Sequence, residues 1–276
     1  MAQNITHKYE YCAIFYSFET GIWYIHLTLE TSGINGMRTI GLLGGMSWES
    51  TAVYYRRLNE NVRDRLGGLR SAKVILHSVD FESIVELQKA DAWDQAGTVL
   101  ATLARNLETA GADCVLICTN TMHKLADTVQ RAISVPLLHI TDVTGQAVAS
   151  AGCRRPLLLA TRYTMEQDFY LSRLRDKHGL APLVPNAEDR TVVHDIIFNE
   201  LCCGIVRESS RQRYLEIIAT AQAAGADSVI LGCTEIGLLI GPQHFDLPAF
   251  DSTLLHADAA VAFAMERHDE PTRSAA

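Results

Sequence analysis

Short apolar runs alternate with longer amphipathic or alanine-rich segments along the chain after residue 36. The apolar runs have the length of buried strands, and the segments between them have the length of helices. Strands that alternate with helices in this way are typical of a parallel sheet covered by helices on both faces. The predicted strands span residues 39–43, 73–79, 114–118, 135–140, 156–161, 228–234 and 247–251, and the predicted helices span about residues 48–65, 93–110 and 142–152.

The strand pattern repeats after 112 to 116 residues. The run that begins at Cys114 ends in polar side chains at Thr119, and the run that begins at Ser228 ends in the same way at Cys233, 114 positions later. A repeat of this length predicts two pseudo-symmetric three-layer α/β domains, each a mostly parallel sheet flanked by helices. We expect the active site between them, where the strand tips face a shared cleft. The predicted boundaries are residues 37–141 plus 252–276 for the first domain and residues 142–251 for the second.

Residues 1–36 differ from the rest of the chain, because seven aromatic side chains crowd into a segment that has no counterpart in the repeat. The segment lacks the charged start and the continuous apolar core of a secretory signal. Met37 begins the first clean strand pattern. We therefore predict an N-terminal extension that is not part of the core, with an extra hairpin packed on the domain as the alternative.

The composition is that of an ordinary globular protein, with 48% hydrophobic and 20% charged residues. A formal net charge of −8 disfavours nucleic acid or an anionic membrane as a partner. No apolar run approaches the roughly 20 residues of a membrane helix. Seven cysteines without a CxxC pair fit neither a disulfide framework nor a metal site. These features predict a cytoplasmic protein without a bound metal, in which a free thiol can act chemically.

Cys233 is the candidate reactive thiol. It follows an apolar strand and stands next to Thr234 and Glu235, and a thiolate at this position can act as a base or as a nucleophile. A buried, inert cysteine is the alternative. The matching residues 119–121 either cap the following helix or hold a polar substrate.

The turn after the first strand, Gly44-Gly45-Met46-Ser47, lacks the GxGxxG spacing of dinucleotide-binding folds. Ser47 is suited to cap the helix that follows. At the corresponding turn of the second half, Arg162 is placed to meet an anion in the cleft.

These turns occur in the order found in the aspartate/glutamate racemase superfamily, which the chain resembles over about residues 37–265. The motifs that carry the resemblance are Gly44-Gly45-Met46-Ser47, Val79-Asp80-Phe81, Asn120-Thr121 followed by His123, Thr161-Arg162-Tyr163-Thr164-Met165 and Gly232-Cys233-Thr234-Glu235. The resemblance implies a homodimeric amino-acid racemase that needs no pyridoxal phosphate (PLP) or other cofactor. In this family two cysteines face opposite sides of the α-carbon of a small amino-acid substrate. One removes the α-proton and the other returns a proton to the far face.

The first cysteine of that pair is replaced in this chain. Family members usually read Cys-Asn-Thr where this chain has Thr119-Asn120-Thr121, and Cys118 lies one residue too early. Since side chains alternate in direction along a strand, Cys118 should point away from the cleft when Thr119 points into it. A subgroup of racemases with Thr-Asn-Thr at this tip resembles the chain more closely overall. We therefore expect Cys233 to be the principal base and Thr119 to relay a proton with help from a neighbour or water.

The resemblance also assigns substrate-binding residues. Asn120, Thr121 and Thr234 would hold the α-carboxylate. Gln88 stands where aspartate-acting members have a basic residue, so the substrate is aspartate, glutamate or a broader set of amino acids. The residues expected to complete the substrate site are Met46, Gln88, Arg162 and Glu235.

Two other functions are compatible with the loss of the first cysteine. One is a decarboxylase of the same superfamily, which uses a single cysteine to protonate an enolate. The other is a small-molecule binding protein that keeps the cleft and lacks catalysis. Both alternatives rest on the threonine at position 119.

Overall fold

The computed structural model describes residues 12–17, 22–27 and 36–266 of the chain. Two strands of the N-terminal segment, β1 (Cys12–Ser17) and β2 (Ile22–Leu27), pair as an antiparallel hairpin. The hairpin belongs to a different compact unit from Arg38–Glu266. The units divide after Met37, where the aromatic-rich segment gives way to the first strand pattern. The rest of the predicted extension lies outside the described residues, as do residues 267–276 of the first predicted domain.

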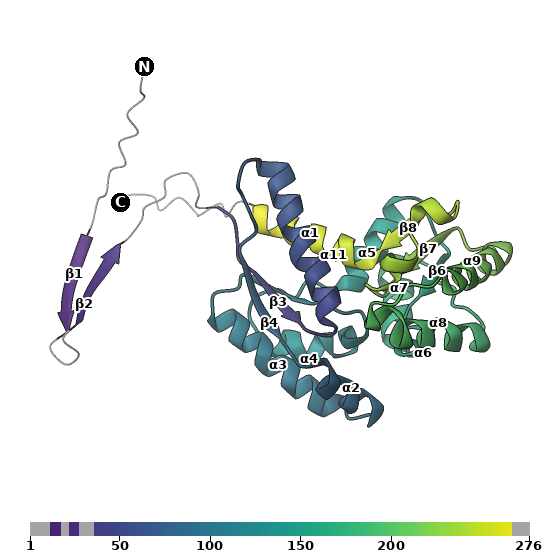
Figure 1. The fold of residues 1–276 in the computed structure, drawn as a ribbon, viewed down its shortest axis with the longest axis horizontal. Coiled ribbons are helices and arrows are strands. Elements are labelled where there is room, and N and C mark those ends of the chain that lie inside the picture. The colour runs from purple at the N-terminus through teal and green to yellow at the C-terminus, as the bar shows by residue number, and fades with distance from the viewer. Residues whose placement is uncertain (1–11, 18–21, 28–35, 267–276) are drawn as a thin grey trace, which may run out of the picture. The chain divides into compact units, whose positions relative to one another are not determined.

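The unit Arg38–Glu266 contains two α/β halves, each built on a three-stranded parallel sheet (Figure 1). The first sheet has the order β4-β3-β5, with Ile40 opposite both Val74 and Cys114. Its strands are β3 (Ile40–Gly44), β4 (Val74–Ser78) and β5 (Cys114–Ile117). The helices of this half are α1 (Trp48–Leu66), α2 (Phe81–Lys89), α3 (Trp93–Thr109), the 3₁₀ helix η1 (Thr121–Leu125) and α4 (Ala126–Ala132).

The second sheet has the order β6-β7-β8 and is also parallel, which confirms the predicted α/β fold of two similar halves. Its strands are β6 (Pro156–Leu159), β7 (Ser228–Leu231) and β8 (Ala249–Asp251). The helices from here to the end of the unit are α5 (Ile140–Ser150), α6 (Arg162–Glu166), α7 (Asp168–His178), α8 (Ala187–Asn199), η2 (Leu201–Cys203), α9 (Glu208–Ala223), α10 (Ile236–Leu239), η3 (Pro242–His244) and α11 (Ser252–Met265). Within the described part of the chain, no helix has both the length and the apolar content needed to cross a membrane.

One predicted strand is wrong. Residues 135–140 form only a single parallel bridge, between Leu137 and Val115, and helix α5 begins already at Ile140. The imidazole of His139 accepts a hydrogen bond at 3.2 Å from the backbone N–H two residues further on and so caps this helix. The apolar run therefore leads into helix α5 rather than continuing as a strand, because the His139 side chain accepts a hydrogen bond from an N–H group of the first turn of that helix.

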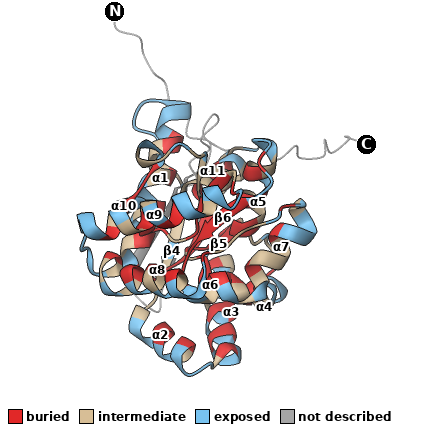
Figure 2. Ribbon diagram, turned by 90° about the vertical axis from the view of Figure 1, so that its right-hand side faces the viewer, coloured by how far each residue is buried: buried red, intermediate tan, exposed pale blue. Residues whose placement is uncertain are grey.

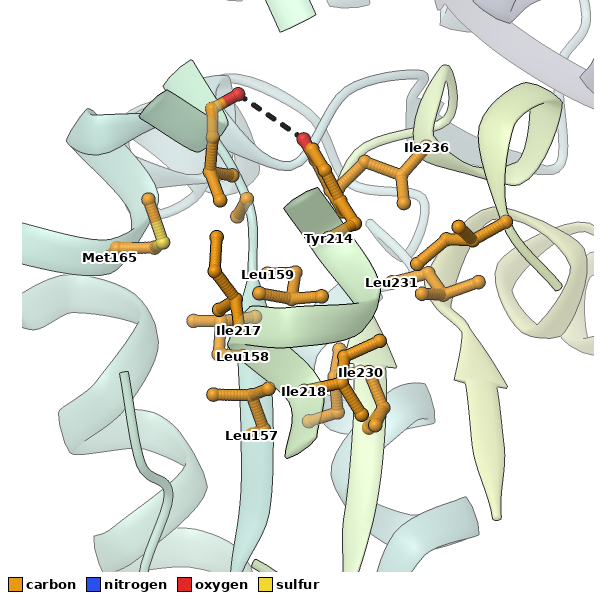
Figure 3. Close-up of a cluster of buried hydrophobic side chains, with 14 of the residues drawn as sticks. Leu157, Leu158, Leu159, Met165, Tyr214, Ile217, Ile218, Ile230, Leu231 and Ile236 are labelled. Carbon is orange, nitrogen blue, oxygen red and sulfur yellow. Dashed lines mark hydrogen bonds between the residues drawn. The ribbon is translucent and has the colours of Figure 1, made fainter. Parts of the chain in front are cut away.

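Helices cover the central strands of both sheets, whereas β4 at the edge of the first sheet is only partly buried. Every residue of β3 and β5 is buried, as near-continuous apolar strands predict, and Figure 2 shows the buried residues on the strands and on the helix faces that cover them. In the second half, Leu157–Leu159 of β6 share a core cluster with Ile217 and Ile218 of α9 (Figure 3). The hydroxyl of Tyr214 at the edge of this cluster donates to the carbonyl oxygen of Val193 at 3.2 Å.

Helix α11 joins the two halves, because it follows β8 of the second half and packs against both α1 and α5 (Figure 1). The guanidinium of Arg57 on α1 makes two 2.7 Å hydrogen bonds to the carboxylate of Asp258 on α11. His256 donates from Nε2 to the carbonyl oxygen of Leu138 at 2.8 Å. Its Nδ1 accepts a hydrogen bond from the Tyr54 hydroxyl, also at 2.8 Å.

Removal of the Tyr54 hydroxyl is expected to destabilise this junction. Burial lowers the pKa of His256 to about 4, so the ring is neutral, and its single N–H is already given to Leu138. Tyr54→Phe leaves the buried Nδ1 without a donor, which costs about 1–3 kcal/mol in the free energy of unfolding. Unfolding in denaturant measures this cost. The neighbouring Tyr55 is 55% exposed, so Tyr55→Phe should change the free energy by less than about 0.5 kcal/mol; equal losses in the two variants would contradict this account.

Candidate active site

The strand tips of β5 and β7 meet at one cavity, which lies at the start of η1 and of α10. Of the nine residues predicted for the site, all except Arg162 line it. The cavity volume is about 30 Å³, which is room for one or two water molecules. The lining residues are Met46, Phe81, Gln88, Thr119, Asn120, Thr121, Thr161, Ile197, Phe198, Cys202, Gly232, Cys233, Thr234 and Glu235.

Gly45 forms the turn that brings Met46 to this cavity and Ser47 within hydrogen-bond reach of Glu235. Its φ angle is +88°, and a Cβ atom there would lie 2.3 Å from the carbonyl oxygen of Val79, so only glycine fits. The Ser47 side chain then accepts a hydrogen bond from the Ser50 N–H at 3.3 Å, which confirms Ser47 as the N-cap of α1.

Cys233 has a carboxylate as its hydrogen-bond partner. Its Sγ donates to Oε2 of Glu235 at 3.0 Å, and Oε1 of the same carboxylate accepts a hydrogen bond from Ser47 Oγ at 2.7 Å. Glu235 is only 5% exposed, and among the described residues no lysine, arginine or histidine lines the cavity. The carboxylate is therefore fixed beside the thiol, and the described residues of the cavity wall include no cationic side chain to neutralise it.

Burial raises the pKa of the Cys233 thiol well above its ordinary value, and the negative charge of Glu235 raises it further. The thiol is therefore protonated at neutral pH. Its proton already points at the Glu235 carboxylate. Transfer along this hydrogen bond forms a thiolate without adding net charge to the buried pair, which avoids most of the cost of a second buried charge.

The strand tip after β5 makes a contact equivalent to that of Ser47 with Glu235, but between two hydroxyl groups. Thr121 Oγ1 lies 2.9 Å from Thr161 Oγ1. Thr121 precedes Glu235 by 114 positions, and Ser47 precedes Thr161 by the same number, so the two contacts occupy equivalent places in the repeat. A threonine hydroxyl cannot take up a proton as a carboxylate does. Only the tip that carries Cys233 therefore has a proton acceptor built beside it.

Thr119 lines the cavity and is held by its backbone. Its N–H donates to the carbonyl oxygen of Ile117 at 2.8 Å, and its own carbonyl oxygen accepts a hydrogen bond from His123 Nδ1 at 2.8 Å. Burial and the neighbouring His139 lower the pKa of His123, so its ring is neutral. His123 Nε2 accepts a hydrogen bond from the N–H of Ile140 at 3.2 Å. This histidine thus ties the Thr119 tip to the start of α5.

Cys118 is fully buried and does not line the cavity, as the alternation of side chains along a strand predicts. Burial raises the pKa of its thiol. Cys118 therefore cannot replace the missing first cysteine.

Thr234 is surrounded by hydroxyl groups from two other elements. Its Oγ1 lies 2.5 Å from Ser50 Oγ of α1 and accepts a hydrogen bond from Thr253 Oγ1 of α11 at 3.2 Å. Together with Thr121, it places one hydroxyl from each half at the cavity. These hydroxyls can donate to an anionic ligand group from two sides.

The structure places Arg162 outside the predicted site. Its side chain is exposed and does not line the cavity. Thr161, which follows β6 and precedes α6, lines the cavity instead. Helix α6 begins at Arg162, and the side chain of Arg162 points to solvent. The backbone N–H of Arg162 donates to His194 Nδ1 at 3.3 Å. The structure therefore leaves the cavity without the cation that the sequence had suggested.

Sequence reasoning missed part of the wall, formed by Ile197 and Phe198 of α8 and Cys202 of η2. No element was predicted in this part of the chain. Helix α8 could have been found from its N-cap, Asn186, whose side chain accepts a hydrogen bond from the N–H of Asp189. Which face of that helix meets the cavity depends on packing, and the sequence carries no direct signal of it.

Comparison with known proteins places the chain in a family. A sequence profile described as Asp/Glu/hydantoin racemase matches residues 43–260. The chain belongs to this family. Membership of this family supports racemase activity, and the two-domain fold is that of solved Asp/Glu racemases.

Three relatives show how far the similarity extends. A broad specificity amino-acid racemase, RacX of Bacillus subtilis strain 168, is 21% identical over 81% of this chain and 96% of its own length. The crystal structure of a proposed Asp/Glu racemase from Yersinia pestis is 48% identical, covers 83% of this chain and 100% of its own, and superposes with a TM-score of 0.79. An aspartate racemase homologue from Pyrococcus horikoshii OT3 is 33% identical with the same coverage and a TM-score of 0.74.

Proposed function

We propose that the protein is a PLP-independent amino-acid racemase in which Cys233 is the principal base. The observation that carries this proposal is the 3.0 Å hydrogen bond from the Cys233 thiol to the buried carboxylate of Glu235, in a cavity that also contains Thr119. A base and a candidate proton relay on two strand tips match what inversion at an α-carbon requires. Membership of the racemase family supports the same reaction.

The first step is removal of the α-proton. Glu235 takes the proton of the Cys233 thiol, and the thiolate then abstracts the proton from the α-carbon of the substrate. The pair now holds two protons, and the substrate carries the negative charge, delocalised into its carboxylate. A positioned base of this kind contributes about 10²–10⁴-fold to the rate.

The substrate carboxylate is held by the hydroxyls of Thr121 and Thr234. Each is supported by hydroxyls on other elements, Thr121 by Thr161 at 2.9 Å and Thr234 by Ser50 at 2.5 Å. Donors fixed in this way stabilise the charge that moves onto the carboxylate as the α-proton leaves. The two halves must move apart to admit an amino acid, because the cavity of about 30 Å³ is too small for one.

The second step returns a proton to the opposite face of the α-carbon. The Thr119 hydroxyl gives its proton to the carbanion and recovers one from water, while the pair of Cys233 and Glu235 releases its extra proton to solvent. Atoms and charge balance over the cycle. Because Thr119 has no carboxylate at the position equivalent to Glu235, we expect this step to be the slower one.

The lining of the cavity favours a broad substrate range. It contains no cationic side chain among the described residues, so a side-chain carboxylate of aspartate or glutamate meets the neutral amide of Gln88 instead. That amide can donate to a carboxylate and can also pair with a hydroxyl or carboxamide. The remaining wall includes Phe81, Ile197 and Phe198, which suit the methylene groups of such side chains.

Incubation with single L-amino acids in heavy water, without added cofactor, tests this function. We expect α-deuterium incorporation and formation of the D-enantiomer for several amino acids, at least one of them with an uncharged polar side chain. Mass spectrometry and chiral chromatography measure the two products. Folded protein that catalyses neither across a panel of common amino acids would refute the proposal. Release of carbon dioxide from an arylmalonate would then identify the decarboxylase.

A further inference from the structure

Two thiols belong to the wall of the same small cavity. Cys233 follows β7, and Cys202 lies in the 3₁₀ helix η2. Helix η2 packs against α10, which begins three residues after Cys233. Because the cavity has room for only one or two water molecules, groups on its wall lie close to one another. Proton transfer at the α-carbon uses Cys233 and leaves the second thiol without a role.

Both thiols interact with one carboxylate. Cys233 Sγ donates to Oε2 of Glu235 at 3.0 Å. Burial raises the pKa of the Cys202 thiol, and the charge of Glu235 and a hydrogen bond to its carboxylate raise it further. Two thiols that hydrogen-bond to the same carboxylate have their sulfur atoms near each other. Glu235 therefore marks the place where the two side chains meet.

The other cysteines of the unit Arg38–Glu266 do not line this cavity. Cys203 is next to Cys202 in the sequence, but it is exposed, and its Sγ donates to the carbonyl oxygen of Phe198 at 3.7 Å. The remaining three are buried elsewhere: Cys114, Cys118 and Cys153. Within this unit, Cys202 is thus the one thiol that shares the cavity with Cys233.

The cavity suits a small oxidant. Thiolates rather than thiols attack peroxides, and the Cys233 thiolate forms when its proton moves to Glu235. Hydrogen peroxide has two heavy atoms and is about as large as two water molecules, so it fits a cavity of about 30 Å³ that is too small for an amino acid. The protein without substrate can therefore bring a peroxide to Cys233.

We propose that a hydroperoxide oxidises Cys233 and that Cys202 then forms a disulfide with it. In the first step the Cys233 thiolate attacks the peroxide. An S–O bond forms and the O–O bond breaks, and the departing oxygen takes the proton from Glu235 and leaves as water. In the second step the Cys202 sulfur attacks the sulfenic sulfur of Cys233. The S–S bond forms and the S–O bond breaks, and the hydroxyl leaves with the Cys202 proton as water. Two thiols lose two electrons, and one hydrogen peroxide becomes two water molecules.

The position of Cys202 allows the bond to close. A disulfide needs Cβ atoms about 3.5–4.5 Å apart. Helix η2 has three residues and ends at Gly204, whose φ angle is +70°, so a short segment next to a glycine carries Cys202 to its partner. The disulfide removes the base from the reaction, and reduction by a thiol returns it. It also protects Cys233 from irreversible oxidation to the sulfinic acid.

Mass spectrometry of the oxidised protein tests the proposal without requiring turnover. The intact protein is treated with a small molar excess of hydrogen peroxide and digested with trypsin without reductant. We expect a disulfide between the peptides of residues 191–207 and 214–267, which hold Cys202 and Cys233. The rate of α-deuterium exchange should fall by about tenfold or more and return to within about twofold of its starting value with dithiothreitol.

Matched serine variants identify the partner of Cys233. Cys202→Ser keeps the size of the side chain and should abolish the cross-link, so that peroxide converts Cys233 to the sulfinic acid and dithiothreitol no longer restores exchange. Cys203→Ser should respond as the wild-type protein does. Oxidation of wild-type Cys233 without the cross-link would overturn the proposal, as would a cross-link that survives in Cys202→Ser and disappears in Cys203→Ser. A cross-link in a protein that never exchanges the α-proton would refute the racemase function alone.

Discussion

Replacement of Cys233 by alanine is expected to lower the rate of α-deuterium incorporation by about 10³-fold or more, since the variant loses the group that removes the proton. The thiol is the side chain that faces Glu235 at 3.0 Å in the cavity. The measurement is the initial rate of exchange in heavy water at saturating concentration of an amino acid that the wild-type protein exchanges. Circular dichroism verifies that the variant is folded.

Two other cysteines serve as matched controls for this variant. Cys118→Ala removes a fully buried thiol next to the first strand tip, and Cys202→Ala removes a second thiol from the lining of the same cavity. We expect both to keep exchange within about tenfold of wild type, because neither thiol is assigned a proton transfer. Loss of exchange in Cys118→Ala with retention in Cys233→Ala would show that the base had been assigned to the wrong tip.

Glu235→Gln is expected to lower the exchange rate at neutral pH by about 10²-fold and to change its pH dependence. Glutamine keeps the size of the side chain and can still contact Ser47, but it cannot take the thiol proton. Burial raises the pKa of Cys233, so its thiolate forms without Glu235 only at alkaline pH. The rate of the variant should therefore rise about tenfold for each pH unit until the thiol ionises, whereas the wild-type rate changes little around neutral pH.

The direction of this pH effect follows from the charge of the pair. In the wild-type protein the proton moves from Cys233 to Glu235 inside the pair, so the active form needs no loss of a proton to solvent. In the variant the thiol must lose its proton to solvent, and a higher pH favours that loss. Profiles of kcat/KM against pH for the two proteins measure the difference.

The equivalent contact at the other tip provides the control for Glu235→Gln. Thr161→Val removes the hydroxyl that contacts Thr121 at 2.9 Å and leaves the pair of Cys233 and Glu235 intact. It should lower the rate without changing the shape of the pH profile. If Glu235→Gln also keeps the wild-type profile, Glu235 does not take the thiol proton, and its effect is on packing alone.

Most of the fold could be predicted from local patterns. The strands β3, β5, β6 and β7 are continuous apolar runs with glycine or polar residues at their ends, and such runs are typical of parallel strands that are buried on both faces. The run at residues 135–140 was predicted as a strand for the same reason, but it pairs through a single bridge because His139 caps a helix that begins at the next residue. Periodicity alone could not decide between these outcomes, because a short apolar run is compatible with either.

The site could be predicted as far as its strand tips. Thr119 and Cys233 follow β5 and β7, and parallel strands in two similar halves bring such tips to one cleft. Arg162 was misplaced, because the direction of a side chain at the first residue of a helix depends on how that helix packs. Ile197 and Phe198 were missed because they reach the cavity from a helix of the second half that carries no motif.

The sequence by itself determined the repeat, the two strand tips and the replacement of the first cysteine by Thr119, since each of these is a matter of residue identity and spacing along the chain. It assigned Glu235 only to substrate binding. The tertiary structure decided that Glu235 contacts the Cys233 thiol and is anchored by Ser47, which lies 188 residues away in the sequence. It also decided that the Asn120 oxygen has no hydrogen-bond donor among the described residues. Hydrogen-bond partners between the halves are set by how the halves pack together, and no local pattern along the chain specifies that packing.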